Sequence, residues 1–236
     1  MYGQKEPSVE SLLKKVPFFT QLKHDEATTL AERLVPRSFN ANSIIFHLGD
    51  PGGLLYIITR GKVKIAHSTP DGQEALLAIL GTGDFFGELA LLDDAPRSAT
   101  AEAIEATETL TLHREEFIRF LNSNPGFAYH VMQTLAKRIR HLNDQISDVF
   151  FLDLNGRLAR TLLNLAEQHG REVTDGTLID ISLTQTDLAE MTGATRVSIN
   201  KTLGRFRRAK WVRVKGRHLI LLDTPALRNL IHLAGG

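Results

Sequence analysis

Glu88 and Arg97 are an acidic and a basic residue within one otherwise apolar segment. They lie nine residues apart in the segment FFGELALLDDAPRSATA, residues 85–101, which otherwise has the composition of a buried apolar strand. Ionic side chains are rarely buried without a partner. The pair is therefore predicted either to bind a ligand or to form a buried salt bridge of its own.

A second group of residues that could bind a partner is a basic block near the C-terminus. It contains nine basic residues and no acidic residue: Arg196, Lys201, Arg205, Arg207, Arg208, Lys210, Arg213, Lys215 and Arg217. Residues 153–236 contain 13 Lys and Arg against 8 Asp and Glu, a net charge of +5, whereas residues 1–152 contain 15 against 19, or −4. Such a block is often only a solvated face, and by itself it is equally consistent with a nucleic-acid partner.

Metal and thiol chemistry have little support in the sequence. There are no cysteines, which excludes disulfides, thiolate-bound zinc and cysteine-held iron–sulfur clusters. His47, His67 and His113 are the candidates for a metalloenzyme built on a β-roll, but they lie on different runs without the spacing of metal ligands. We therefore expect no metal and no enzyme, and metal analysis distinguishes the alternatives.

Length and composition indicate two modest domains. The chain has 236 residues, of which 42% are hydrophobic and 23% charged, as in ordinary globular proteins. The N-terminus lacks the apolar core of a signal peptide, and no apolar run approaches the roughly 20 residues that a membrane span needs. We expect a cytoplasmic protein without membrane contacts.

The N-terminal half is predicted to be rich in short strands. Residues 9–35 have the apolar spacing of helices, broken by Pro17. From about residue 37 the period changes to two, in the runs SIIFHLGD, LLYIITRG, KVKIAHS, EALLAILGTGD, SATAEAIE and TETLTLHR. TPDGQ predicts a hairpin turn, and the number of short strands favours a barrel or sandwich. REEFIRFLNSNP then predicts a helix that ends near Asn124.

A long helix is predicted over residues 127–150. One side carries an apolar seam at intervals of four and three: Val131, Leu135, Ile139, Leu142, Ile146 and Val149. This narrow, heptad-like seam favours pairing with the same helix of a second copy, and packing on its own domain is the alternative. FLDLNGR, residues 151–157, interrupts the pattern and predicts a domain boundary with a hinge at residues 153–155.

The segment LTQTDLAEMTGATRVSINKTLGRFRRAKWV has the pattern of a helix-turn-helix. Thr184 and Asp187 have the spacing of a capping box, Gly193 ends the first helix, and Thr195 can cap the second. A small residue, a glycine and a buried aliphatic residue follow at the required spacing: Ala189, Gly193 and Ile199. An αα-hairpin without a DNA role is the alternative, but the basic block begins on the second helix and favours DNA.

The flanking segments complete a winged helix-turn-helix. A helix from about residue 157 to 168 and the loop HGREVTDGT precede it, and WVRVKGRHLILLD predicts two strands around Lys215-Gly216-Arg217. Arg196 can bond a guanine bidentately, Val197 can pack on a thymine methyl, and the wing can hold phosphates. The predicted DNA contacts are Thr195, Arg196, Val197, Ser198, Lys201, Arg205, Lys215 and Arg217, with Lys210 and Arg213 as further phosphate contacts.

A β-rich domain, a long pairing helix and a basic winged helix follow one another in this sequence. In this order the whole chain resembles the CRP/FNR family of bacterial transcription regulators. FGELALLDDAPRSATA is similar to the family's phosphate-binding cassette, F-G-E-[LI]-A-L, a short gap and P-R-[ST]-A. The resemblance implies a cyclic nucleotide in the β-roll, with Glu88 accepting from the ribose 2′-hydroxyl. Its phosphate would bind the side chains of Arg97 and Ser98 and backbone N–H groups near Gly87, Leu89 and Ala90.

Some positions depart from the family pattern. Where cAMP-responsive members present Thr-Ser or Thr-Asn to the purine, this chain has Leu142 and Asn143. An asparagine amide can bond adenine or guanine, whereas Ser98 in place of threonine favours cAMP. We therefore expect cAMP as effector, with cGMP possible. Arg138 matches an arginine that the family directs towards the ligand, and is expected to support the phosphate or Glu88.

The recognition helix also departs from the cAMP-type pattern. Those members carry Arg-Glu-Thr, whereas TRVS is similar to the Arg-Val-Thr of the cyanobacterial nitrogen regulator of the same family. We therefore expect a half-site other than GTGA, in which Arg196 reads a guanine and Val197 an adjacent A·T pair. Two half-sites are expected about one helical turn apart.

The sequence thus predicts an α+β fold in three parts. These are a jelly-roll-like β-roll that binds a cyclic nucleotide (1–126), a dimerisation helix (127–152) and a winged helix-turn-helix (153–236). The expected partners are a palindromic double-stranded DNA operator, a second copy of the chain, and RNA polymerase through the HGREVTDGT loop. The alternatives are a ligand-independent regulator with a structural Glu88/Arg97 pair, and a haem or 2-oxoglutarate sensor on the same scaffold.

Overall fold

The computed structural model describes residues 24–69 and 74–232. It contains two compact units, Met1–Ile139 and Arg140–Gly236. Their boundary lies inside the long helix α5 (Pro125–Phe151). The observed fold is the mixed helix and strand class predicted from the sequence, while the three-part division of the chain stays a prediction.

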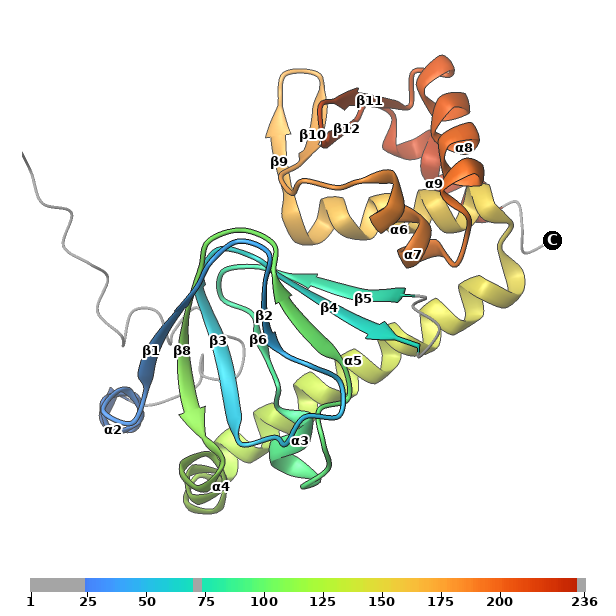
Figure 1. The fold of residues 1–236 in the computed structure, drawn as a ribbon. Coiled ribbons are helices and arrows are strands. Elements are labelled where there is room, and N and C mark those ends of the chain that lie inside the picture. The colour runs from blue at the N-terminus through green and yellow to red at the C-terminus, as the bar shows by residue number, and fades with distance from the viewer. Residues whose placement is uncertain (1–23, 70–73, 233–236) are drawn as a thin grey trace, which may run out of the picture. The chain divides into compact units, whose positions relative to one another are not determined.

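The N-terminal unit is a β-roll made of two antiparallel sheets (Figure 1). One sheet has the order β1 (Val35–Phe39), β8 (Thr107–His113), β3 (Leu54–Arg60) and β6 (Phe85–Phe86). The other has the order β2 (Ser43–Phe46), β7 (Thr100–Ala103), β4 (Val63–Ser68) and β5 (Glu74–Leu80). β4 and β5 pair as the predicted hairpin requires, although most of the TPDGQ turn lies outside the described residues.

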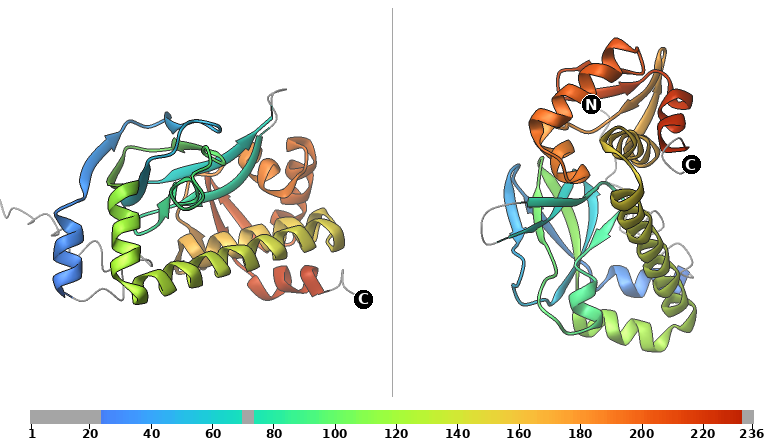
Figure 2. Two further views of the ribbon diagram at one scale, coloured as in Figure 1. Left: turned by 90° about the horizontal axis from the view of Figure 1, so that it is seen from below. Right: turned by 90° about the vertical axis from the view of Figure 1, so that its right-hand side faces the viewer.

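Strand β3 explains how the roll builds two hydrophobic clusters. Because successive side chains of a strand point to opposite faces, Leu55 and Ile57 enter one cluster, and Tyr56 and Ile58 enter the other. The first cluster is covered by α2 (His24–Ala31), α4 (Arg114–Ser123) and the first turns of α5. In Figures 1 and 2, α2 and α4 lie side by side at one end of the roll.

Two elements of the roll differ from the sequence prediction. The stretch that begins at Phe85 is not a continuous strand, because Gly87 has a φ of +82° and ends β6 after two residues. A one-turn helix, α3 (Leu89–Leu92), follows it. Strand β1 was not predicted, since four of its five residues are exposed and it therefore lacks an alternating apolar pattern. Most of the predicted helix over residues 9–35 lies outside the described residues.

The C-terminal unit is a winged helix-turn-helix, as predicted. Its helices are α6 (Leu154–His169), α7 (Gln185–Thr192), α8 (Arg196–Arg208) and α9 (Thr224–His232). Its sheet has the order β11 (Val212–Lys215), β12 (His218–Leu221), β10 (Gly176–Ile179) and β9 (Gly170–Val173). Helix α9 packs along α6, as Figure 2 shows.

Two boundaries in this unit differ from the prediction. HGREVTDGT is a hairpin rather than a loop, because Val173 pairs with Gly176 across a two-residue turn and β9 and β10 flank it. Helix α6 starts at Leu154, three residues earlier than predicted, because the Asp153 side chain accepts a hydrogen bond from the Gly156 N–H at 2.9 Å and caps the helix. The interruption between α5 and α6 falls where the sequence placed it.

The helix-turn-helix itself follows from local capping. The Thr184 hydroxyl accepts from the Asp187 N–H, and the Asp187 carboxylate accepts from the Thr184 N–H, which forms the predicted capping box. Gly193, at φ +60°, ends α7, and Thr195 caps α8. Ala189 and Ile199 are buried between the helices.

Candidate functional site

Glu88 and Arg97 are both buried in the β-roll, with 4% and 5% of their surface exposed. Within the described residues, no ion pair joins them. Glu88 is instead paired with Arg138 of α5, whose Nη1 lies 2.5 Å from Glu88 Oε1 and whose Nη2 donates to the Phe85 carbonyl at 3.0 Å. The structure thus contradicts a direct Glu88–Arg97 salt bridge and pairs Glu88 with Arg138, while a role of Arg138 in ligand binding stays a prediction.

Arg97 has no carboxylate partner among the described residues, and its guanidinium is bound mainly by backbone. Nη1 donates to the Gly87 carbonyl and Nη2 to the Leu54 carbonyl, each at 2.9 Å. Its Nε is buried without a hydrogen-bond partner within the described part of the chain. Two aromatic rings lie beside the cation, Phe46 with its centroid 4.2 Å from the guanidinium carbon and Tyr56 at 5.7 Å.

The electrostatics of this site favour an anion. Burial lowers the pKa of Arg97, and the nearby Tyr56, Glu88 and Asp50 act in the opposite direction. Burial also raises the pKa of Tyr56, so its hydroxyl stays neutral. Since a guanidinium remains charged in proteins, the roll contains a buried cation that Glu88 and Asp50 compensate only in part, and an anion beside it would offset the remaining cost of burial.

Gly87 is required by the geometry of this site. Its φ of +82° lies in the left-handed region, and a Cβ there would lie 2.5 Å from Arg97 Nη1 and 3.0 Å from the Leu54 carbonyl oxygen. A glycine therefore lets the main chain approach the guanidinium closely. The first-turn N–H groups of the short helix that follows, including those of Leu89 and Ala90, have no intrahelical acceptor.

The loop before β3 fixes the main chain of Arg97, a contact that the sequence analysis missed. The Arg97 N–H donates to the Asp50 carbonyl at 2.8 Å, and the Gly49 N–H donates to the Arg97 carbonyl at 2.9 Å. The Asp50 carboxylate in turn accepts from the His47 N–H at 2.7 Å. Gly49, Asp50 and Pro51 form a turn-like sequence, which is the signal that could have pointed to this loop.

The other predicted ligand residues have mixed environments. Ala90 is buried, whereas Ser98 and Leu89 are exposed. Leu142 and Asn143 are exposed residues of α5 that belong to the C-terminal unit. Their purine contact stays a prediction.

Most of the predicted DNA-contacting residues are exposed in the winged helix-turn-helix. Val197, in the first turn of α8, has 65% of its surface exposed although it is apolar. Also exposed are Thr195, Arg196, Lys201, Arg205, Lys215 and Arg217, while Ser198 is half-buried and its N–H donates to the Thr195 hydroxyl. Arg205 also donates to Thr202 Oγ1 at 3.1 Å.

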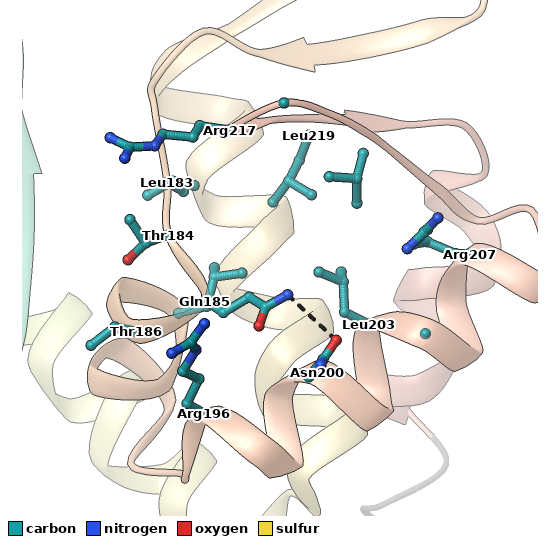
Figure 3. A pocket seen from close by; sticks show the side chains of 14 residues that line it. Leu183, Thr184, Gln185, Thr186, Arg196, Asn200, Leu203, Arg207, Arg217 and Leu219 are labelled. Carbon is teal, nitrogen blue, oxygen red and sulfur yellow. Dashed lines mark hydrogen bonds between the residues drawn. The ribbon is translucent and has the colours of Figure 1, made fainter.

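A groove of about 430 Å³ runs between the start of α7, helix α8 and the wing (Figure 3). Arg196, Arg207 and Arg217 line it, and no acidic side chain of the described residues does. Gln185 donates from Nε2 to Asn200 Oδ1 at 3.4 Å, which links α7 to α8 (Figure 3). The sequence analysis did not select Gln185, Asn200 or Arg207, although Asn200 lies one helical turn beyond Arg196 and this spacing could have indicated it.

One predicted phosphate contact is already paired. Arg213 Nη1 lies 2.7 Å from Asp175 Oδ2 in the β9–β10 turn, because the sheet brings this turn near β11. Its charge is therefore partly neutralised, in contrast to the charges of Lys215 and Arg217, which have no ion-pair partner in the described ranges.

Neither a metal centre nor a membrane span is found in the described residues. No group of three or more His, Cys, Asp or Glu side chains there could hold a metal ion. No described helix is both long and apolar enough to cross a bilayer.

Comparison with known proteins identifies both halves of this arrangement. Residues 36–124 match the family model of the cyclic nucleotide-binding domain, and residues 156–230 match that of the Crp-like helix-turn-helix domain. The chain is 32% identical over 219 residues to the CRP-like cAMP-activated global transcriptional regulator of Mycobacterium tuberculosis, covering 93% of this chain and 98% of that protein. The chain belongs to the CRP/FNR family. Members of this family are transcription regulators, not enzymes.

Further relatives agree with this placement. The chain is 33% identical over 191 residues to the Cyclic AMP receptor protein of Thermus thermophilus, covering 81% of this chain and 85% of that protein. Among solved structures, a CRP-family transcriptional regulator from Thermus thermophilus, TTHB099, has a TM-score of 0.69 at 25% identity, covering 83% of this chain and 96% of that one. FixK2 from Bradyrhizobium japonicum has a TM-score of 0.75 at 20% identity, covering 84% and 96%, and shares the fold.

Proposed function

We propose that this CRP/FNR-family regulator is a homodimer whose DNA binding is controlled by cAMP bound in the β-roll. The observation that carries the proposal is the buried guanidinium of Arg97, which has no carboxylate partner among the described residues and an unpartnered Nε. A cyclic phosphodiester brings one negative charge, which matches one uncompensated cation. Relatives named as cAMP-activated or as a cyclic AMP receptor support the choice of nucleotide.

Glu88 completes the proposed nucleotide site. Arg138 binds one of its carboxylate oxygens, and a carboxylate has about four acceptor positions, so Glu88 retains capacity for a ribose 2′-hydroxyl. Because Arg138 neutralises Glu88, the charge that remains for the ligand is that of Arg97. This balance argues against the alternative of a ligand-independent regulator with a structural Glu88/Arg97 pair.

The purine specificity depends on α5. Leu142 replaces a hydrogen-bonding residue of the cAMP-responsive pattern, and the neighbouring Asn143 can bond either purine. The proposal of cAMP over cGMP therefore depends on Ser98 and on the named relatives, and cGMP is the second candidate. Ligand that bridges the roll and α5 would shift the population towards the DNA-binding state.

Dimerisation through α5 is supported by the exposure of its apolar seam. Val131 and Leu135 pack into the first cluster of the roll, but the apolar residues farther along the helix are half or more exposed: Ile139, Leu142, Ile146 and Val149. Such a row of apolar side chains fits a second α5 in a coiled coil. Ile146→Glu is expected to convert the dimer to monomer in sedimentation experiments, while Leu77→Glu, on exposed β5, leaves it dimeric.

The proposed operator is a palindrome with a half-site other than GTGA. Arg196 and Val197 are exposed in the first turn of α8, where they can reach a guanine and a thymine methyl. Binding-site selection from random DNA tests this, and a strict optimum of GTGA contradicts it. RNA polymerase is the further partner that we propose, through the exposed β9–β10 hairpin.

Calorimetric titration of the full chain with cAMP and with cGMP tests the proposed function. Saturable binding of one nucleotide that disappears in Arg97→Leu supports it. Arg60→Leu is the matched control, because Arg60 lies on the same roll but is exposed in an ion pair with Glu108 at 3.3 Å. Wild-type protein that binds neither nucleotide contradicts the effector and directs the search to other signals.

A further inference from the structure

The guanidinium of Arg97 lies on the ring of Phe46, the last residue of β2. The guanidinium carbon is 4.2 Å from the ring centroid, well within the distance of a cation–π interaction. Arg97 is 5% exposed and has no ion-pair partner in the described part of the chain. The aromatic face therefore takes the place beside this cation that a carboxylate usually takes.

The cation–π contact uses none of the hydrogen-bond donors of the guanidinium. An aromatic ring binds a cation with its electron-rich face and uses none of the five in-plane N–H donors. Two of these donors are bonded to the carbonyls of Gly87 and Leu54. Nε, which lies on another edge, has no partner within the described residues. A carboxylate in the position of Phe46 would compete with an anionic ligand, whereas the ring does not.

The Phe46 ring is itself held by neighbouring aromatic residues. Its centroid lies 5.8 Å from that of Phe86 and 5.7 Å from that of Tyr56, and these two rings stack at 4.9 Å. The β2–β7 pairing also shifts register between Ile44 and Phe46, and such irregularities redirect side chains. The ring therefore packs within an aromatic cluster beside Arg97.

We infer that Phe46 is a positioning residue for effector binding, whose ring face holds the Arg97 guanidinium so that Nε is presented to the phosphate. Phe46 acts through Arg97 and does not itself bind the nucleotide. This inference rests on the proposed function, in which Arg97 binds the phosphate of a cyclic nucleotide.

The test compares three variants by cAMP calorimetry. Phe46→Leu removes the aromatic face and is expected to weaken binding about 3- to 30-fold, the range of a partly desolvated cation–π contact. Phe46→Tyr keeps the face and should restore affinity to near that of the wild type. Phe39→Leu is the matched control, because Phe39 contacts the same cluster through Tyr56 at 6.2 Å but is not over Arg97. Equal affinity of Phe46→Leu and wild type overturns the inference.

A second measurement on ligand-free protein separates this inference from the proposed function. In ¹⁵N-arginine NMR, the Arg97 Nε–H signal, assigned with Arg97→Lys, should be displaced by the ring current of Phe46. It should move towards the positions of exposed arginines in Phe46→Leu and not in Phe39→Leu. An unmoved signal overturns the inference whatever the nucleotide result. A moved signal in a protein that binds no cyclic nucleotide supports the placement of Arg97 and contradicts only the proposed effector.

Discussion

Replacing Gly87 with alanine probes a close contact in the proposed ligand site. Gly87 has a φ of +82°, and the left-handed region costs a residue with a Cβ about 1–2 kcal/mol. The new Cβ would also lie 2.5 Å from Arg97 Nη1 and 3.0 Å from the Leu54 carbonyl oxygen. One of these groups must therefore move.

Arg97 cannot move without loss, although an arginine is usually flexible. Its guanidinium is buried, rests on the Phe46 ring and donates to two carbonyls. A hydrogen bond to a charged group contributes about 1.5–3 kcal/mol. Alanine also restricts the unfolded chain, which offsets about 0.4–1 kcal/mol. We expect Gly87→Ala to lower the stability of the β-roll by about 2–4 kcal/mol and to weaken nucleotide binding.

The assay must report on the roll separately from the C-terminal unit. Hydrogen exchange of the β8 amides reports on the roll, while the single tryptophan, Trp211, lies in the C-terminal unit and serves as an internal reference. Gly126→Ala is the matched control, because among the described residues no atom beyond its own helix lies within 4 Å of its added Cβ and its φ is not in the left-handed region. It lies in the first turn of α5 and should leave stability unchanged or raise it by up to about 1 kcal/mol.

Similar stability of Gly87→Ala and Gly126→Ala would contradict the claim that a Cβ at residue 87 cannot be accommodated beside Arg97. A destabilised Gly87→Ala protein that keeps full nucleotide affinity refutes a different step, namely that the position of the Arg97 guanidinium governs binding. Protection of α8 amides and Trp211 fluorescence should be the same in both variants.

The remaining predictions concern the C-terminal unit. Gly204→Ala should stabilise α8 by about 1 kcal/mol in urea unfolding followed by Trp211 fluorescence, because the added Cβ meets only Arg208 Nη1, at 3.8 Å. The hydrogen bond from the Gly156 N–H lowers the pKa of the Asp153 carboxyl in the folded protein. The ionised Asp153 therefore stabilises the fold fully above the ordinary pKa near 3.8, and this stabilisation is lost as pH falls through the lower folded pKa. Asp153→Asn should keep the cap and remove this pH dependence from the unfolding midpoint. Lys215→Gln should reduce the slope of log affinity for DNA against log salt by about 0.9 for each subunit, or about 1.8 for the proposed dimer, whereas Arg213→Gln changes it less; equal changes contradict the pairing of Arg213 with Asp175.

Local signals in the sequence predicted the elements that depend on local physics. The capping box at Thr184, the turn at Gly193 and the burial of Ile199 are all found in the structure. Each depends on residues within one or two helical turns, so spacing alone specifies it. Strand β1 and helix α3 were missed because one lacks alternation and the other is a single turn.

The partners of the buried charges could not be predicted in the same way. Glu88 pairs with Arg138, fifty positions along the chain, and Arg97 lies on Phe46, fifty-one positions away. The motif around them identifies which residues are special but contains no information on what each one contacts. Only the resemblance to a family directed attention to Arg138, and nothing in the sequence pattern selected Phe46.

The seam of α5 shows a related limit of periodicity. The six apolar residues at intervals of four and three lie on one side of the helix, and pairing with a second copy and packing on the chain's own domain were the two interpretations. Val131 is part of the core of the roll and the partly buried Leu135 packs against it, while Ile139 and Ile146 are 58% and 56% exposed. The first two residues of the seam therefore pack on their own domain. The exposed residues that follow them in the seam remain available for a partner. A period specifies which side of a helix is apolar, but the surrounding structure decides what covers each turn. The change from covered to exposed turns occurs within one continuous helix, α5 (Pro125–Phe151).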